Sequence, residues 1–278
     1  MNLDLYISDL DGTLLNSEQV VSDRSAGIIN GLIEAGLNFT IATARSYEAS
    51  KNILEPLHLK LPVILNNGAF IYSPFSGKNI VENYLSHEDV DFILDSYLYR
   101  NISPFVSAVD SAGNKKIFYK GVFNRGQEIY INSRRKNKDR RLQRVSDFSI
   151  IGHFNIINIF SIEESGRLDY EYKLFKDKLN VSCHYTEEIY SKGFFWLETT
   201  NINANKSCAA LYLKKCLKAD RLICFGDNLN DAPLFRAADV KYAVKNAYAQ
   251  LKKLATGVID SNNEDGVAEF LKLNSNRI

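Results

Sequence analysis

The amino-acid sequence predicts an α/β protein in which a doubly wound parallel sheet is interrupted by an inserted α+β domain. Strand-like and helix-like segments alternate at the start of the chain, and the same alternation returns at its end. The middle of the chain lacks the Asp- and Gly-rich strand ends found on both sides of it. The 278 residues are enough for one large or two ordinary domains.

The first part of the expected core spans residues 1–83. Its expected strands are Leu3–Ser8, Asn38–Ala42 and Pro62–Leu65. Ser22 and Ser46 can each cap a helix between these strands, and Gly36 ends the first helix. This βαβαβ order indicates a parallel sheet with helices on both faces.

The second part of the core is expected over residues 189–278, where strands and helices again alternate. The expected strands are Phe194–Glu198, Arg221–Phe225, Val240–Val244 and Val258–Ile259. A helix is predicted over Ser207–Leu217, with Ala209 and Leu213 on its apolar side, and a last helix near Glu264–Leu273. The sheet would therefore combine both ends of the chain.

Residues 84–188 form the predicted insertion. Amphipathic patterns predict helices over Glu88–Leu98 and Leu168–Leu179, and strands over Ile117–Lys120 and Ile156–Ser161. Two chain crossings would join this domain to the core, which makes a hinge plausible.

Two carboxylates follow the first strand, in the motif Asp9-Leu10-Asp11-Gly12-Thr13. Because side chains alternate along a strand, Asp9 and Asp11 are expected to project to the same side. Two like charges held so close are unfavourable unless a cation or a proton lies between them. The motif therefore indicates a hard metal ion and chemistry on a phosphate.

Three further motifs lie at expected strand ends or helix starts. Thr43-Ala44-Arg45 offers a hydroxyl and helix N–H groups suited to a phosphate oxygen, although a simple helix cap is the favoured interpretation of this motif taken by itself. Lys206 alone would be an ordinary surface charge. Gly226–Asp231 is an Asp- and Asn-rich turn, and Leu229 stands where an EF-hand needs a ligand. In an open parallel sheet, such strand ends meet along one edge, where ligands bind.

Taken together and in this order, the four motifs resemble those of the haloacid dehalogenase-like superfamily. The segments Val244-Lys245-Asn246-Ala247 and Asn263-Glu264-Asp265-Gly266-Val267-Ala268 resemble its Cof-type branch, subclass IIB. That branch has a Rossmann-like core and carries an α+β cap domain between its second and third motifs. Ala44 departs from the glycine that is more frequent there.

The resemblance implies that Asp9 attacks phosphorus and becomes an aspartyl-phosphate. Asp11 would protonate the leaving alcohol and later deprotonate the attacking water. Mg²⁺ would be held by Asp9, the backbone carbonyl of Asp11, and Asp227, all hard oxygen donors.

The resemblance also implies how the phosphate is held. Lys206 and Thr43 would hold the non-bridging oxygens, where charge lies in the transition state. Asp231 would orient Lys206 or a metal-bound water. The implied phosphate- or substrate-binding residues are Thr43, Ala44, Asn67 and Asn230.

The expected function is therefore a Mg²⁺-dependent phosphatase for small phosphorylated metabolites, with sugar phosphates favoured because a cap over the cleft would exclude polymers. A phosphotransferase or phosphomutase could use the same intermediate. A non-catalytic binding protein could keep the fold without the chemistry.

The charge balance predicts neither nucleic acid nor a membrane as partner, because 34 basic and 33 acidic residues nearly cancel. The segment 133–144 holds seven basic residues. It is interpreted as a solvated face, with nucleic-acid binding or steering of anionic metabolites as alternatives. Scattered cysteines and the lack of a signal-like start predict a cytoplasmic protein. The sequence does not indicate an oligomeric state.

Overall fold

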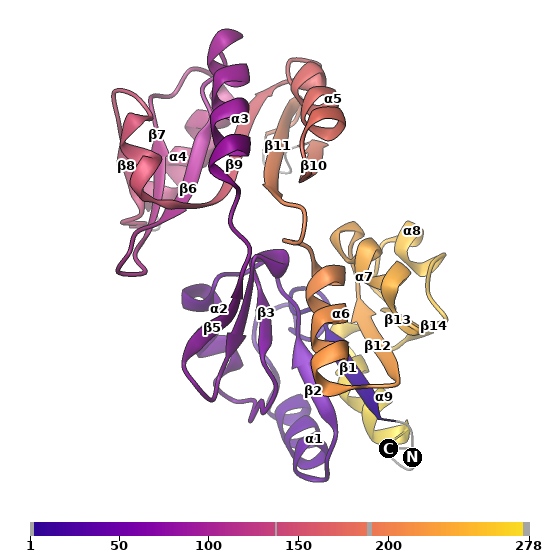
Figure 1. The fold of residues 1–278 in the computed structure, drawn as a ribbon. Helices are drawn as coiled ribbons and strands as arrows, with labels where there is room; N and C mark the ends of the chain where they lie inside the picture. The colour runs from indigo at the N-terminus through magenta and orange to yellow at the C-terminus, as the bar shows by residue number, and fades with distance from the viewer. Residues whose placement is uncertain (1–2, 137, 188–190, 275–278) are drawn as a thin grey trace. The chain divides into compact units, whose positions relative to one another are not determined.

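The structure is a computed structural model that describes residues 3–136, 138–187 and 191–274. The chain divides into two compact units (Figure 1). Unit 1 comprises residues 1–82 and 204–278, and unit 2 comprises residues 83–203. The expected boundary between residues 188 and 189 lies outside the described residues.

A parallel five-stranded sheet forms the centre of unit 1, in the order β14-β13-β12-β1-β2. Its strands are β1 (Asp4–Ser8), β2 (Asn38–Ile41), β12 (Arg221–Gly226), β13 (Val240–Val244) and β14 (Gly257–Ile259). β1 pairs with β12 along its whole length, from Asp4 opposite Arg221 to Ser8 opposite Phe225. The predicted α/β class with a parallel sheet is confirmed, and the two ends of the chain share this sheet.

Helices of unit 1 follow most of these strands. They are α1 (Asp23–Glu34), α2 (Tyr47–Leu54), α6 (Lys206–Leu217), α7 (Ala232–Ala237), α8 (Ala249–Lys252) and α9 (Gly266–Asn274). Ser22 caps α1 by accepting a hydrogen bond from the Ser25 N–H at 2.9 Å. Ile29 and Ile33 of α1 are buried, as are Leu5 and Ile7 of β1. Burial of these apolar side chains stabilises the helix-on-sheet arrangement.

The third expected strand pairs mainly with the strand that follows it, rather than as a full member of the parallel sheet. β3 (Val63–Leu65) pairs antiparallel with β4 (Phe70–Ser73), which in turn pairs with β5 (Lys78–Glu82). Its link to the parallel sheet is an isolated bridge between Ala42 and Ile64. The intervening turn reverses the chain, because Asn66, Asn67 and Gly68 all have positive φ angles.

Unit 2 is built on a six-stranded sheet in the order β10-β11-β9-β6-β7-β8. Its strands are β6 (Phe105–Val109), β7 (Lys115–Tyr119), β8 (Leu142–Arg144), β9 (Asn155–Glu164), β10 (Val181–Glu187) and β11 (Phe194–Asn201). Its helices are α3 (His87–Tyr99), α4 (Arg125–Lys136) and α5 (Asp169–Lys178). α3 and α5 pack on one face of the sheet and α4 on the other (Figure 1). No helix in the described ranges is both long and apolar enough to cross a bilayer.

The structure corrects the placement of one strand. The run Phe194–Glu198 was expected in the core sheet, but β11 pairs antiparallel with both β9 and β10 in unit 2. The apolar pattern of a strand predicts that it is buried, but not which sheet buries it. At the end of β11, the Asn201 side-chain amide donates to the Tyr84 carbonyl at 2.7 Å, so the two segments of unit 2 that lead to unit 1 are hydrogen-bonded.

Candidate active site

The candidate site lies where β1 and β12 end. The Asp9 N–H donates to the Phe225 carbonyl at 3.0 Å, which continues the β1–β12 pairing one residue past β1. This bond sets Asp9 beside the loop that follows Gly226. The carboxyl ends of parallel strands share one edge of a sheet, so segments more than 200 residues apart meet here.

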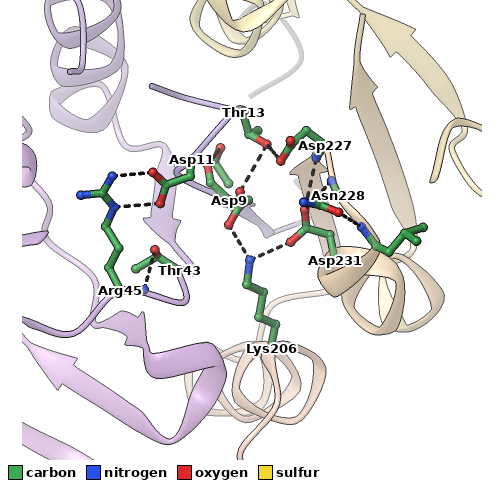
Figure 2. Close-up of polar contacts among 11 residues, drawn as sticks. Asp9, Asp11, Thr13, Thr43, Arg45, Lys206, Asp227, Asn228 and Asp231 are labelled. Carbon is green, nitrogen blue, oxygen red and sulfur yellow. Dashed lines mark hydrogen bonds and ion pairs between the residues drawn. The ribbon is translucent and has the colours of Figure 1, made fainter. Parts of the chain in front are cut away.

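Lys206, the first residue of α6, points into this edge from a third segment (Figure 2). Its ammonium donates to Asp9 Oδ1 at 2.5 Å and to Asp231 Oδ1 at 2.7 Å. Lys206 is 2% exposed and Asp9 is 5% exposed. A buried ammonium is costly unless it is paired and hydrogen-bonded, so the two carboxylates account for its position.

A close backbone contact positions the start of α6. A Cβ atom on Gly68 would lie 2.4 Å from the carbonyl oxygen of Asn205, and Gly68 has a φ angle of 100°. Asn205 caps the helix by accepting a hydrogen bond from the Cys208 N–H at 2.8 Å. The turn at residues 66–68 therefore does more than reverse the chain, because it also supports the residue before Lys206.

Asp231 uses both carboxylate oxygens within the protein. Oδ1 accepts from Lys206, and Oδ2 accepts from the N–H groups of Asp227 at 3.2 Å and Asn228 at 3.3 Å (Figure 2). These bonds hold the lysine on one side and the 226–231 loop on the other. This geometry suits an orienting role for Asp231.

Two carboxylates of the site, those of Asp9 and Asp227, are placed to bind a divalent cation. Carboxylate oxygens of Asp9, Asp227 and Asp231 lie within 4.8 Å of one another. Because Asp231 is fully engaged, Asp9 and Asp227 are the two that would hold an ion. Thr13 Oγ1 links them, at 3.5 Å from Asp9 Oδ2 and 3.1 Å from Asp227 Oδ1. Gly12 leaves them room, since a Cβ there would lie 2.5 Å from Asp227 Oδ2. Hard oxygen donors of this kind suit Mg²⁺.

The site carries more negative than positive charge. Burial raises the pKa of Asp9, although Lys206 opposes this effect. Burial and the neighbouring Asp231 raise the pKa of Asp227 to about 6. Burial alone would lower the pKa of Lys206, but Asp9 and Asp231 raise it, so the lysine stays charged. When all three carboxylates are ionised against one ammonium, negative charge is in excess, and a bound cation would relieve that excess.

The structure corrects the expected orientation of Asp11. β1 ends at Ser8, so strand alternation does not extend to residues 9 and 11. Instead, Asp11 forms a two-point ion pair with Arg45, whose Nε donates to Oδ2 at 2.8 Å and whose Nη2 donates to Oδ1 at 2.5 Å. The Asp11 side chain is 48% exposed, whereas Asp9 is buried against Lys206.

The expected phosphate-binding residues of the second motif lie beside this ion pair. Thr43 is buried, and its Oγ1 accepts a hydrogen bond from the Arg45 N–H at 3.1 Å. Its hydroxyl hydrogen is thereby left to donate to another acceptor. Ala44 is exposed. The Thr43 carbonyl accepts from the Asn67 N–H at 2.9 Å, so the two loops support each other.

Asn67 and Asn230 are not hydrogen-bonded to the aspartates in the described part of the chain. Each has a buried side-chain oxygen that accepts no hydrogen bond from the described residues. Buried polar atoms are nearly always partnered in folded proteins. These two oxygens are therefore open to a water or a ligand group.

Sequence reasoning assigned no role to three residues that shape the site. Arg45 was part of a motif, and its pairing with Asp11 depends on the turn after β1. Thr13 links Asp9 and Asp227. Asn246 donates from its side-chain amide to the Gly12 carbonyl at 2.7 Å. The segment 244–247 resembles the family, and this resemblance is the signal in the sequence that points to Asn246.

Comparisons with known proteins find relatives that match along nearly the whole chain. The chain is 26% identical over 285 residues to the 5-amino-6-(5-phospho-D-ribitylamino)uracil phosphatase YwtE of Bacillus subtilis, covering 95% of each protein. A solved protein from Thermotoga maritima matches with a TM-score of 0.75 and 23% identity, covering 98% of this chain and 97% of the other. A subclass IIB sugar phosphatase of the superfamily matches with a TM-score of 0.72 and 17% identity, covering 97% and 98%. The two structural likenesses show a shared fold.

A family model described as haloacid dehalogenase-like hydrolase matches residues 6–271, which is nearly the whole chain. The match includes the four motifs and the segment between them. The superfamily predicted from those motifs is thus confirmed, and the chain belongs to the haloacid dehalogenase-like hydrolases.

Proposed function

We propose that this protein is a Mg²⁺-dependent phosphatase that hydrolyses small phosphate monoesters through a phosphorylated Asp9. The observation that carries the proposal is the convergence of Asp9, Asp227 and Lys206 at one edge of the parallel sheet. The similarity of the chain to proteins named as phosphatases from Bacillus subtilis and Buchnera aphidicola supports the same reaction class.

In the first step, a carboxylate oxygen of Asp9 forms a bond to phosphorus while the bond from phosphorus to the ester oxygen breaks. Lys206 holds Asp9 in place and lies close enough to stabilise negative charge on the transferring group. The Thr43 hydroxyl donates to a non-bridging oxygen. Mg²⁺, held by Asp9, Asp227 and the Asp11 carbonyl, would supply positive charge that lets two anions approach.

Asp11 handles the protons in both steps. It enters the first step protonated and gives that proton to the departing alkoxide, and the carboxylate so formed later takes a proton from the water that cleaves the bond between phosphorus and Asp9. Arg45 pairs with the Asp11 side chain and positions it at the rim of the site. Asp231 keeps Lys206 oriented throughout.

We further propose that the substrates carry several hydroxyl groups, as sugar or alditol phosphates do. Two Bacillus subtilis relatives are named for a substrate with a phosphorylated ribityl chain. A structural neighbour is titled a sugar phosphatase. We expect small phosphorylated metabolites, rather than polymers, to be the substrates.

Phosphate release from a panel of phosphorylated metabolites, measured with purified protein and Mg²⁺, tests this function. Release that requires Mg²⁺ and disappears in Asp9→Asn would support it. Added acceptor sugars identify a phosphotransferase, because the phosphoryl group would then appear on the acceptor rather than as inorganic phosphate. Failure to hydrolyse any ester, including a reactive aryl phosphate, would contradict the proposal and favour a binding protein.

A further inference from the structure

The loop that follows the first motif, residues 14–20, sends one side chain back to the ion pair between Asp11 and Arg45. Arg45 Nη2 donates to Gln19 Oε1 at 3.1 Å while it also donates to Asp11 Oδ1 at 2.5 Å. The Arg45 Nε–H donates to the other Asp11 oxygen (Figure 2). The guanidinium therefore has a neutral acceptor, the Gln19 amide oxygen, beside the two oxygens of Asp11.

Gln19 adopts a backbone conformation that glutamine seldom takes. Its φ angle is 60°, in the left-handed region that favours Gly and Asn. The turn is closed by Asn16, whose side-chain oxygen accepts from the N–H groups of Glu18 at 3.0 Å and Val20 at 3.3 Å. In the described part of the chain, the Gln19 side chain takes no part in closing this turn. A residue poorly suited to its φ angle, in a turn that does not need its side chain, points to a use of that side chain elsewhere.

The same loop is also held from outside, by the segment that precedes α9. The Ser17 N–H donates to Asn263 Oδ1 at 2.9 Å. The Asn262 side-chain amide donates to the Leu15 carbonyl at 2.8 Å. Gln19 is therefore presented from a backbone that is already fixed. A group on a fixed backbone loses less conformational freedom when it holds a partner, so it positions that partner more accurately.

Arg45 needs such a partner if it is to position Asp11. The Arg45 side chain is 21% exposed and the Asp11 side chain is 48% exposed, so the pair lies at the rim of the site. A guanidinium that was held by Asp11 alone would move together with Asp11. In the proposed reaction Asp11 gives up and takes back a proton, so its attraction for Arg45 changes within one turnover. The amide oxygen of Gln19 remains an acceptor throughout.

We propose that Gln19 is a positioning residue for proton transfer: it holds the Arg45 guanidinium, and Arg45 in turn holds Asp11 in place. Gln19 does not touch the reacting atoms in this role. The inference rests on the proposed phosphatase function and deepens it, because Gln19 lies outside the four motifs.

Gln19→Met tests the role, because it removes the acceptor and keeps the length of the side chain. Glu18→Met is the matched control: Glu18 is the neighbouring exposed residue of the same loop, and within the described ranges its side chain makes no hydrogen bond. We would measure kcat and KM for an alkyl and an aryl phosphate with both variants, with Arg45→Gln, and with Gln19→Met combined with Arg45→Gln. Hydrogen exchange of the Arg45 Nε–H, assigned by NMR from its absence in Arg45→Gln, gives a second readout without substrate.

We expect Gln19→Met to lower kcat for the alkyl phosphate roughly three- to tenfold, the range of a single hydrogen bond, with KM nearly unchanged. The aryl phosphate should be affected much less, because its leaving group departs with less need of a proton. The Arg45 Nε–H should exchange faster than in the wild type. In the Arg45→Gln background the same substitution should cause little further loss, because residues that act through one another are not additive. Glu18→Met should match the wild type, and thermal melting should show that all variants fold.

Wild-type rates in Gln19→Met, equal losses with both esters, the same loss in Glu18→Met, or the full loss repeated in the Arg45→Gln background would each overturn the proposal. Failure of the phosphatase function would look different, because the wild type would then release no phosphate from either ester. The exchange measurement still decides in that case. Faster exchange in Gln19→Met would show that Gln19 holds Arg45, and equal exchange in the two proteins would show that it does not.

Discussion

Two regions of the molecule are dense in charge, and they differ in how that charge is balanced. In the candidate active site, Asp9, Lys206, Asp227 and Asp231 come from segments far apart in sequence and converge in a largely buried place. In unit 2, the basic run 133–144 gathers its charges along the end of α4, the following turn and β8. Asn137 of this run lies outside the described residues.

The basic run is partly neutralised within unit 2. Asp139 accepts from Arg134 at 3.2 Å and from Arg141 at 2.7 Å. Arg135 donates to the Tyr119 hydroxyl at 3.3 Å, and Arg144 donates to a backbone carbonyl. In unit 1, by contrast, three carboxylates share one ammonium and remain in excess. A high density of charge therefore does not by itself indicate a binding site, whereas buried charge without a matching partner indicates a ligand.

Replacing the proposed nucleophile should have the largest effect. Asp9→Asn keeps the shape and can still accept a hydrogen bond from Lys206, so the protein should fold. It cannot attack phosphorus effectively, and turnover should fall by several orders of magnitude, as for other groups that act as part of a unit. Steady-state phosphate release and a thermal melt measure the two effects. Near-normal rates would refute the assignment of Asp9.

Removing the second carboxylate of the proposed cation site should weaken the binding of Mg²⁺ more than it destabilises the fold. We expect Asp227→Asn to raise the Mg²⁺ concentration needed for half-maximal rate by roughly 10–100-fold, the scale seen when metal sites lose supporting groups. Mg²⁺ should raise the melting temperature of the wild type and have less effect on the variant. An identical Mg²⁺ dependence in both proteins would exclude Asp227 as a ligand.

Arg45→Gln tests whether the ion pair positions Asp11. Losing it should lower kcat for alkyl phosphates by roughly 10–100-fold, within the range of general acid–base effects. The kcat for an aryl phosphate should fall much less, because its leaving group departs with less need of a proton. Equal losses with both ester types would show that Arg45 acts on binding or folding instead of on Asp11.

Gly68→Ala tests the contact that supports the start of α6. The added Cβ would meet the Asn205 backbone at 2.4 Å, and the φ angle of 100° disfavours any L side chain. We expect a loss of about 1–3 kcal/mol in unfolding free energy, together with reduced activity as Lys206 shifts. Gly27→Ala on α1, where nothing lies within 4 Å of the added atom, is the matched control and should stabilise slightly. Equal stability in both variants would argue against a strained contact.

The smallest effect is expected from Asp139→Asn in the basic run. A side-chain hydrogen bond from Arg141 is the main cause that lowers the pKa of Asp139 to about 2, from its ordinary value of 3.8. A carboxyl group whose pKa is lowered in the folded state stabilises the fold at pH values above its ordinary pKa. This contribution is lost as the pH falls toward 2. Because the pair is partly solvated, the variant should lose only about 1 kcal/mol at neutral pH. Denaturant unfolding at pH 7 and pH 3 measures this loss, and a difference between variant and wild type that is as large at pH 3 as at pH 7 would contradict it.

The sequence alone determined the class of fold and which segments would end along one sheet edge. Apolar periodicity, caps and turns act over a few residues, so β1, β2 and β12 could be expected from the printed letters. The order of the four motifs indicated the superfamily, although Lys206 in isolation resembled any surface lysine.

The tertiary structure decided the partners. It placed β11 in the sheet of unit 2, turned Asp11 toward Arg45, engaged both oxygens of Asp231, and set Asn158 beside Glu198. Such pairings join residues that lie far apart along the chain or depend on a turn or register that local patterns do not specify. Periodicity records which side chains are buried, whereas the identity of each buried partner is set only when the whole chain packs.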